Sequence, residues 1–127
     1  MGFLEGDQSA APLFEAVKRY AESGVTPFHV PGHKKGRGIR EYRDYIGKSV
    51  LRMDANGMDE LDYLNNPSGA IMESQRLFAR AFGADEAFFL VNGTTSGVQA
   101  MIISVCGPGD EIILPRNAHK SAINGII

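Results

Sequence analysis

The sequence predicts an α/β fold with a mostly parallel sheet and flanking helices, preceded by an N-terminal helix and an arm. The first observation is a pair of short apolar runs, at 86–92 and 111–115, which have the length and composition of strands covered on both faces. The second is that helix-like segments precede and follow each run across short connections. We therefore divide the chain into an N-terminal helix and arm at 1–38 and the start of a larger domain at 39–127.

The predicted N-terminal helix covers residues 12–23. Pro12 suits the first helical position, and Gly24 can close the end of the helix. The apolar stripe of this helix consists of Leu13, Phe14, Val17 and Ala21. Prolines and glycines are frequent in residues 24–38, so we expect an ordered loop or arm there rather than a regular element.

Signals are weaker in the next thirty residues. We expect a short helix at 39–47 and a short strand at 49–55, followed by a turn-rich, acidic segment at 56–69. The acidic side chains of that last segment are interpreted as a solvated surface, with a recognition patch as the alternative. They are Asp59, Glu60 and Asp62.

The clearest helix and strand signals begin at residue 69. A helix at 69–82 presents one face and ends at Gly83. That face consists of Ile71, Ser74, Leu77, Phe78, Ala81 and Phe82. After the first apolar run we expect a helix at 95–106 and a Gly-Pro-Gly-Asp turn, and after the second run a loop and a further helix from residue 121.

Composition restricts the class of protein. The chain has 127 residues, of which 43% are apolar and 22% charged, as in a single globular domain. A formal charge of −2 and the lack of a long apolar run indicate neither nucleic acid nor membrane as a partner. The first ten residues carry neither a signal peptide nor a myristoylation signal. With a single cysteine, Cys106, the chain is expected in the reducing cytoplasm.

The corner within "FFLVNGTTSGVQAMI", residues 88–102, admits two interpretations. Thr94 or Thr95 is an N-cap of the following helix, or the corner is an anion pocket that uses the unpaired amides of the helix N-terminus. In the second case Thr94, Thr95 and Ser96 add hydroxyl groups, and Gly93 and Gly97 allow close approach of the backbone. The motifs GxxxxGK[ST] and GxGxxG are both absent, so a cofactor phosphate suits the corner better than a nucleoside triphosphate.

Three histidines are the other candidate site residues. His119 follows the second apolar run and is predicted at the same sheet edge as the corner, where it either serves a ligand or is an ordinary loop histidine. His29 and His33 share a proline- and glycine-rich loop without a third ligand type, so no metal site is expected. The basic side chains of residues 34–43 are interpreted as a solvated face, with a role in anion contact as the alternative.

Four segments together resemble one family closely. They are "TPFHVPGHKKG", "DELDYLNNPSGAI", "AFFLVNGTTSGVQAMI" and "CGPGDEIILPRNAHKS". From about Pro12 to the last residue, the chain is similar to the amino-terminal part of the Orn/Lys/Arg decarboxylases, pyridoxal-phosphate (PLP) enzymes of the aspartate-aminotransferase fold type. The resemblance implies a partial large domain of that fold and a PLP cofactor.

The resemblance also implies roles for individual residues. Thr94, Thr95 and Ser96 match the loop that hydrogen-bonds the PLP phosphate, and His119 matches the histidine that stacks on the pyridine ring. The lysine that anchors the cofactor and the acidic partner of the ring nitrogen are implied to lie beyond residue 127. Lys120 matches the segment that follows the stacking histidine, so it is not expected to be catalytic.

The implied activity is decarboxylation of ornithine, lysine or arginine to a polyamine precursor and carbon dioxide, by a homodimer or larger homo-oligomer. The present chain alone is expected to be inactive, because the implied anchoring lysine and ring-nitrogen partner are not included. Ile126 and Ile127 end an unfinished helical pattern, so the sequence is expected to be the front part of a longer one. Two alternatives stay open. One is a non-catalytic truncated module for assembly or regulation, and the other is an aminotransferase or lyase on the same scaffold.

Overall fold

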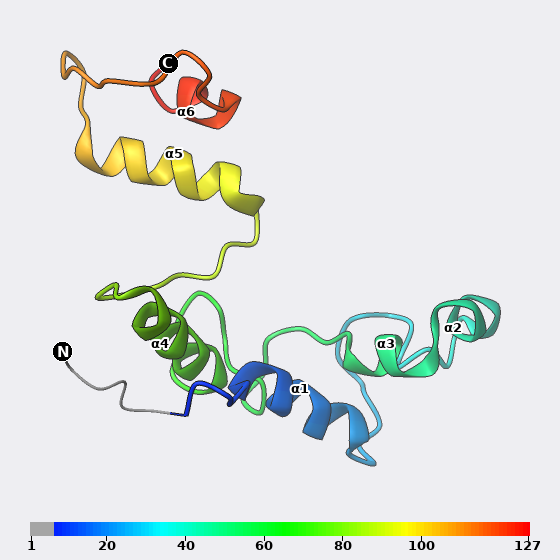
Figure 1. The fold of residues 1–127 in the computed structure, drawn as a ribbon. Helices are drawn as coiled ribbons and strands as arrows, with labels where there is room; N and C mark the ends of the chain where they lie inside the picture. Colours follow the sequence, from blue (N-terminus) through cyan, green and yellow to red (C-terminus); the bar gives the residue numbers. More distant parts are fainter. Residues whose placement is uncertain (1–6) are drawn as a thin grey trace. The chain divides into compact units, whose positions relative to one another are not determined.

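The computed structural model describes residues 7–127, which form two compact units. The first unit comprises the described residues up to Ala87 and the second comprises Phe88–Ile127. The described residues contain six helices and no strand beyond one isolated bridge (Figure 1). The helices are α1 Pro12–Glu22, α2 Arg40–Ile46, α3 Lys48–Met53, α4 Ala70–Phe82, α5 Gly93–Val105 and α6 Lys120–Asn124. None of these helices has the length and apolar character that crossing a bilayer requires.

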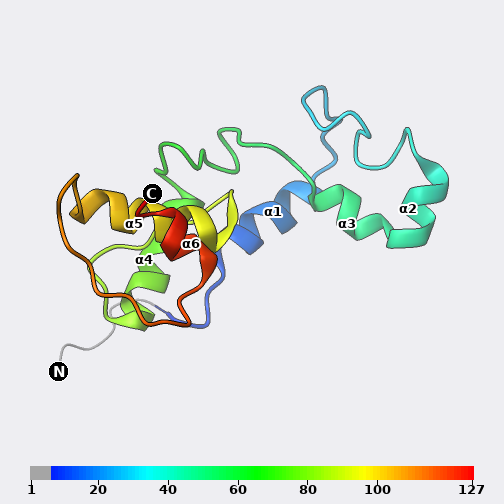
Figure 2. The same ribbon diagram turned by 90° about the horizontal axis from the view of Figure 1, so that it is seen from above.

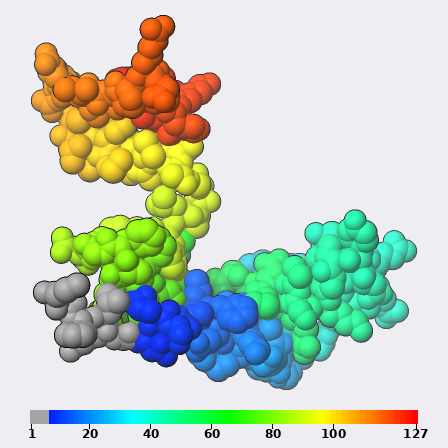
Figure 3. Space-filling model, viewed as in Figure 1, coloured from blue at the N-terminus to red at the C-terminus, as the bar shows by residue number. Residues whose placement is uncertain are grey.

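In the first unit, α1 packs against α4 and α3, and the side-by-side course of α1 and α4 is visible in blue and green (Figure 3). Pro12 occupies the first turn of α1 and Gly83 ends α4 in the left-handed conformation, so both predicted helices are confirmed. The core consists of Ala16, Tyr20 and Leu61, with Val17, Ala55, Met58 and Ala70 packed against it. The predicted stripe of α1 is wrong at Phe14, whose side chain is 56% exposed.

The helix predicted at 39–47 is confirmed as α2, but the strand predicted at 49–55 is wrong, because those residues form most of α3. A helix satisfies its backbone hydrogen bonds within the segment, whereas a strand needs a partner. Leu51 is the buried residue of α3. A Cβ atom on Gly36 would lie 3.0 Å from Leu51 Cδ1, so the glycine lets the preceding arm come close to this helix.

The arm is an ordered loop, as predicted, and its lysines have structural partners. Lys34 Nζ donates to the backbone oxygen of His29 at 2.5 Å. Lys35 Nζ donates to the backbone oxygens of Tyr20 and Val25 and lies 4.2 Å from the centre of the Tyr20 ring. A cation near the last carbonyls of α1 is favourable because that helix end carries partial negative charge. These two lysines therefore tie the arm to α1 instead of belonging to a purely solvated face.

The predicted α/β fold with a mostly parallel sheet is wrong for the residues that the structure describes. The runs at 86–92 and 111–115 have no strand hydrogen bonds with each other or with other described residues. A strand depends on backbone hydrogen bonds to a neighbour, and an apolar run without such a neighbour has no ladder to join. Phe88 and Ile113 are accordingly 72% and 99% exposed.

The second unit consists of α5, α6 and the segments around them. The helix predicted at 95–106 is confirmed but begins two residues earlier, at Gly93, and the helix predicted from residue 121 is confirmed as α6. The two helices pack against each other (Figure 2). Ile102 is 5% exposed, and a Cβ atom on Gly125 would lie 3.0 Å from its Cδ1 atom. The glycine thus allows the end of α6 to approach α5 closely.

The boundary predicted between residues 38 and 39 stays a prediction. The predicted N-terminal part begins with residues 1–6, which lie outside the described residues, together with most of the segment considered for a signal peptide or myristoylation.

Candidate functional site

The corner at the start of α5 leaves its helix N-terminus without a side-chain cap. Asn92 occupies the N-cap position and makes no capping hydrogen bond through its side chain. Thr94 and Thr95 lie inside the first turn and are exposed, so neither stands at the N-cap. Ser96 Oγ donates to the carbonyl oxygen of Gly93 at 2.8 Å. The first-turn amides and two threonine hydroxyls are therefore available to an anion.

The electrostatics of the corner come from the backbone. The first turn of α5 contains no acidic residue, and residues 88–105 contain no charged side chain at all. The N-terminal end of a helix carries roughly half a positive charge, which attracts anions. A phosphate at this position would be held by amides and hydroxyls, without a lysine or arginine from the same segment.

Leu90 and Gly97 pack the corner together. A Cβ atom on Gly97 would lie 2.5 Å from Leu90 Cδ1, which is closer than real side chains approach. The leucine side chain therefore rests on the bare backbone of α5 one turn after its start. Any larger residue at 97 requires the end of this leucine side chain to move.

His119 is the N-cap of α6, and its ring is fixed by Ser121. The ring Nδ1 atom accepts a hydrogen bond from Ser121 N at 3.2 Å and lies 2.9 Å from Ser121 Oγ. The serine is buried whereas the histidine is exposed. The structure thus shows a helix-capping contact for this histidine, which neither of the two sequence interpretations had predicted.

The predicted site residues Thr94, Thr95, Ser96 and His119 all lie in the second unit, the first three in α5 and the histidine just before α6, and these two helices pack together. Among the hydrogen bonds of residues 7–127, none joins the histidine to the three hydroxyl residues. Lys120, the first residue of α6, is exposed. These contacts do not test the assignment of the four residues to a cofactor, which stays a prediction.

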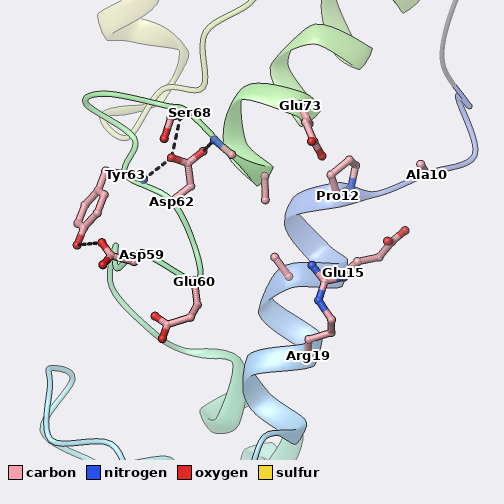
Figure 4. Close-up of a pocket in the computed structure, with 13 residues that line it drawn as sticks. Ala10, Pro12, Glu15, Arg19, Asp59, Glu60, Asp62, Tyr63, Ser68 and Glu73 are labelled. Atoms are coloured by element: carbon pink, nitrogen blue, oxygen red, sulfur yellow. Dashed lines mark hydrogen bonds between the residues drawn. The ribbon is translucent and has the colours of Figure 1, made fainter.

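A separate pocket of about 660 Å³ lies in the first unit between α1, the start of α4 and the loop before it (Figure 4). Its charged lining is mostly acidic and includes a single basic side chain, Arg19. The acidic lining residues are Glu15, Asp59, Glu60, Asp62 and Glu73. The sequence interpretation treated Asp59, Glu60 and Asp62 as a solvated surface, and for Asp62 this is wrong, because that residue is 6% exposed.

Asp62 holds the first turn of α4. Its Oδ2 atom accepts from the backbone amides of Gly69 at 2.8 Å and Ile71 at 3.0 Å, and its Oδ1 atom accepts from Ser68 and Tyr63 at 2.9 and 2.8 Å. The helix has no side-chain cap at Gly69, so this distant carboxylate takes that role. In the sequence, the one signal for this role of Asp62 was that the predicted helix starts without a capping residue of its own.

The protonation of Asp62 follows from these contacts. Burial by itself raises the pKa of a carboxyl group, because the charged form loses hydration. Hydrogen bonds from the backbone of Ser68, Tyr63, Gly69 and Met72 outweigh burial and hold the pKa of Asp62 well below its usual range. Asp62 is therefore a charged structural residue at neutral pH.

His29 and His33 have separate structural partners. His33 Nε2 lies 3.0 Å from Asp54 Oδ2, and its Nδ1 accepts from Gly36 N at 3.2 Å. His29 is hydrogen-bonded to the Tyr20 hydroxyl. Within residues 7–127 no group of three or more His, Cys, Asp or Glu side chains is arranged to hold a metal ion.

Comparisons with known proteins bear on the whole chain. Residues 11–127 match the family described as Orn/Lys/Arg decarboxylase, major domain. The chain is 46% identical over 121 residues to an arginine decarboxylase of Bacillus anthracis, an alignment that covers 94% of this chain and 24% of the relative. It is 32% identical over 131 residues to an ornithine decarboxylase of Haemophilus influenzae, covering 98% of this chain and 18% of the relative.

A third relative is a lysine decarboxylase of Pseudomonas aeruginosa, 32% identical over 123 residues, with 91% of this chain and 16% of the relative covered. The chain spans about a quarter of the length of the arginine decarboxylase and less of the other two. All three relatives are named for the decarboxylation of a basic amino acid.

Proposed function

The chain belongs to the Orn/Lys/Arg decarboxylase family, and we propose that it is part of a PLP-dependent enzyme that decarboxylates a basic amino acid to a polyamine precursor. The observation that carries this proposal is the match of residues 11–127 to the major domain of the family. Because the relatives are several times longer than this chain, the activity is proposed for an enzyme of which these residues represent one portion.

Arginine is the substrate that we propose to test first. Identity to the arginine decarboxylase is 46%, against 32% for the ornithine and lysine decarboxylases. The three substrates share the α-amino acid group and differ at the distal amine or guanidinium. None of the described residues is assigned to that distal group.

The residues at the start of α5 fit a phosphate group. The first-turn amides have no side-chain cap, and Thr94 and Thr95 expose their hydroxyls beside them. Gly93 has a φ of 73° and no neighbouring atom within 4 Å of a Cβ position, so the approach to the backbone is open. When bound, PLP supplies the electron sink that accepts the electron pair released as carbon dioxide leaves.

This chain would contribute binding and orientation to that chemistry. Thr94, Thr95 and Ser96 with their amides would hold the phosphate, and the helix terminus would balance its negative charge. The exposed ring of His119 would lie against the flat face of the cofactor and exclude water from it. We further propose a cytoplasmic homo-oligomer, which the single cysteine and the exposed apolar side chains of the second unit support.

Release of labelled carbon dioxide from arginine, lysine and ornithine tests the proposal in the presence and absence of PLP. The enzyme that contains residues 1–127 together with the remaining major domain should release carbon dioxide from at least one substrate, and only with PLP. Amino-group transfer to a keto acid without carbon dioxide would instead identify an aminotransferase. Carbon dioxide release that is independent of PLP would refute the proposed cofactor.

A further inference from the structure

Ser121 is a buried polar residue whose contacts converge on one histidine atom. Its side chain is 4% exposed, and burial of a hydroxyl group is costly unless the group is hydrogen-bonded. The described contacts provide that bond, since Ser121 Oγ lies 2.9 Å from His119 Nδ1. The backbone amide of the same serine donates to the same nitrogen at 3.2 Å.

These two contacts determine where the proton of a neutral imidazole lies. A backbone amide can only donate, so Nδ1 must act as an acceptor and carries no hydrogen. The proton of the neutral ring is therefore on Nε2. With Nδ1 as an acceptor, the serine hydroxyl donates to it as well, and the backbone amide is the contact that disfavours the alternative tautomer.

The same contacts fix the direction of the ring. A histidine that is held at Nδ1 from two atoms of one residue cannot rotate its ring without losing both bonds. His119 is nevertheless exposed, so part of its side chain stays accessible to a ligand. We propose that Ser121 is a positioning residue that locks His119 in the Nε2–H tautomer and presents its ring to a planar, phosphorylated ligand. The role of His119 toward a ligand rests on the proposed function, whereas the tautomer of its ring rests only on the geometry.

A purely structural role for His119 as an N-cap makes different predictions. An N-cap needs only an acceptor, and asparagine is among the best residues for that position. His119→Asn keeps an acceptor at the start of α6 but lacks the ring, whereas His119→Ala lacks both. Comparing the two variants therefore distinguishes a role of His119 in helix capping from a role of its ring in ligand contact.

The first experiment measures the tautomer directly, by nitrogen NMR of the chain labelled with 15N in its histidine rings. The chain has three histidines, and His119→Asn assigns the signal of interest. Wild-type His119 should show an unprotonated Nδ1 and a protonated Nε2, and Ser121→Thr should keep that pattern. Ser121→Ala keeps the backbone amide but loses the hydroxyl contact, so Nδ1 should stay unprotonated while its signal shifts away from the wild-type position. The control is Ser104→Ala, which removes a serine hydroxyl bonded to the Met101 carbonyl in α5.

A wild-type ring protonated at Nδ1 would overturn the inference, as would a Ser121→Ala spectrum indistinguishable from wild type. Neither result depends on the cofactor. Failure of the proposed function, seen as no PLP binding and no carbon dioxide release by the enzyme, is thereby distinguished from failure of the positioning role.

The second experiment measures PLP affinity by equilibrium dialysis. Ser121→Ala should weaken PLP binding about fivefold, because the net contribution of one hydrogen bond corresponds to about that factor in the dissociation constant. Ser121→Thr should restore it and Ser104→Ala should leave it unchanged. His119→Asn should lose as much affinity as His119→Ala. Wild-type PLP affinity in His119→Asn would show that helix capping alone matters and would overturn the proposed contact of the His119 ring with the ligand.

Discussion

The carboxylate of Asp62 accepts a hydrogen bond from the backbone amide of Ile71, nine positions later, at 3.0 Å. Ile71 lies in the first turn of α4, and its amide would otherwise be buried without a partner. The same carboxylate also receives the amides of Ser68 and Gly69, so one side chain organises the loop and the helix start together. The acidic loop of the first unit is therefore a folding element as well as a pocket wall.

Replacement of Asp62 with asparagine should lower the free energy of unfolding by about 2–3 kcal/mol. An amide offers one accepting oxygen and turns an NH₂ group toward donors, which leaves buried amides unpaired at roughly 1–3 kcal/mol each. Urea denaturation of the chain measures the change. Asp59→Asn is the matched control, because Asp59 is exposed and its one hydrogen bond within residues 7–127 is from the Tyr63 hydroxyl at 3.3 Å. Equal midpoints for the two variants would contradict the structural role of Asp62.

The stability contributed by Asp62 should depend on pH in a definite direction. Its pKa is lowered in the folded chain, so the folded state binds fewer protons than the unfolded state, whose carboxyl has a pKa of about 3.9. The contribution is complete above that value and is lost as pH falls toward the folded pKa. The unfolding free energy of the wild type should therefore drop between about pH 5 and pH 2 more steeply than that of Asp62→Asn. Parallel curves would show that the carboxylate is not specially stabilised.

Contact between Leu90 and Gly97 should be visible as coupling between two substitutions. Gly97→Ala places a methyl group where Leu90 Cδ1 now lies, so the loss of the leucine contact should offset the roughly 1 kcal/mol that alanine gains over glycine inside a helix. In a Leu90→Ala background the methyl group has room, so the same substitution should be stabilising by about that full amount. The double-mutant cycle is measured by urea denaturation. Additive effects of the two substitutions would show that the leucine does not rest on the glycine.

The hydroxyls of Thr94 and Thr95 should contribute to phosphate binding and not to stability. Valine keeps the shape of threonine and removes its hydroxyl, so each of Thr94→Val and Thr95→Val should weaken PLP binding about fivefold. Because both residues are exposed, unfolding midpoints should barely change. Thr26→Val, at another exposed threonine in the first unit, is the control. Unaltered PLP affinity in both variants would remove these residues from the proposed phosphate site.

The helices were predictable where their signals are local. These signals act within one or two turns of chain. They are Pro12 at the start of α1, Gly83 at the end of α4 and the spacing of apolar residues within each helix. The apolar runs near Phe88 and Ile113 gave an incorrect sheet, because a strand exists only through hydrogen bonds to another segment, and composition does not supply that partner.

The candidate site shows the same division between local and distant causes. The start of α5 was located to within two residues from its glycine and hydroxyl pattern. The role of Asp62 was missed, because its hydrogen-bond partners lie up to ten positions away and its burial depends on packing around α1 and α4. The contact of Ser121 with His119 spans only two residues, yet it became meaningful only once the serine was seen to be buried.

Lys120 should not behave as a cofactor-anchoring lysine. It lies next to His119 at the start of α6 and is exposed, as are Lys18 and Lys48. Treatment of the chain with PLP and borohydride should therefore label these three lysines to similar, substoichiometric extents. Lys34 should react less, because its amine donates to the backbone carbonyls of Phe28 and His29. Peptide mass spectrometry measures each site, with Lys120→Arg as control, and a stoichiometric adduct at Lys120 alone would reverse its assignment.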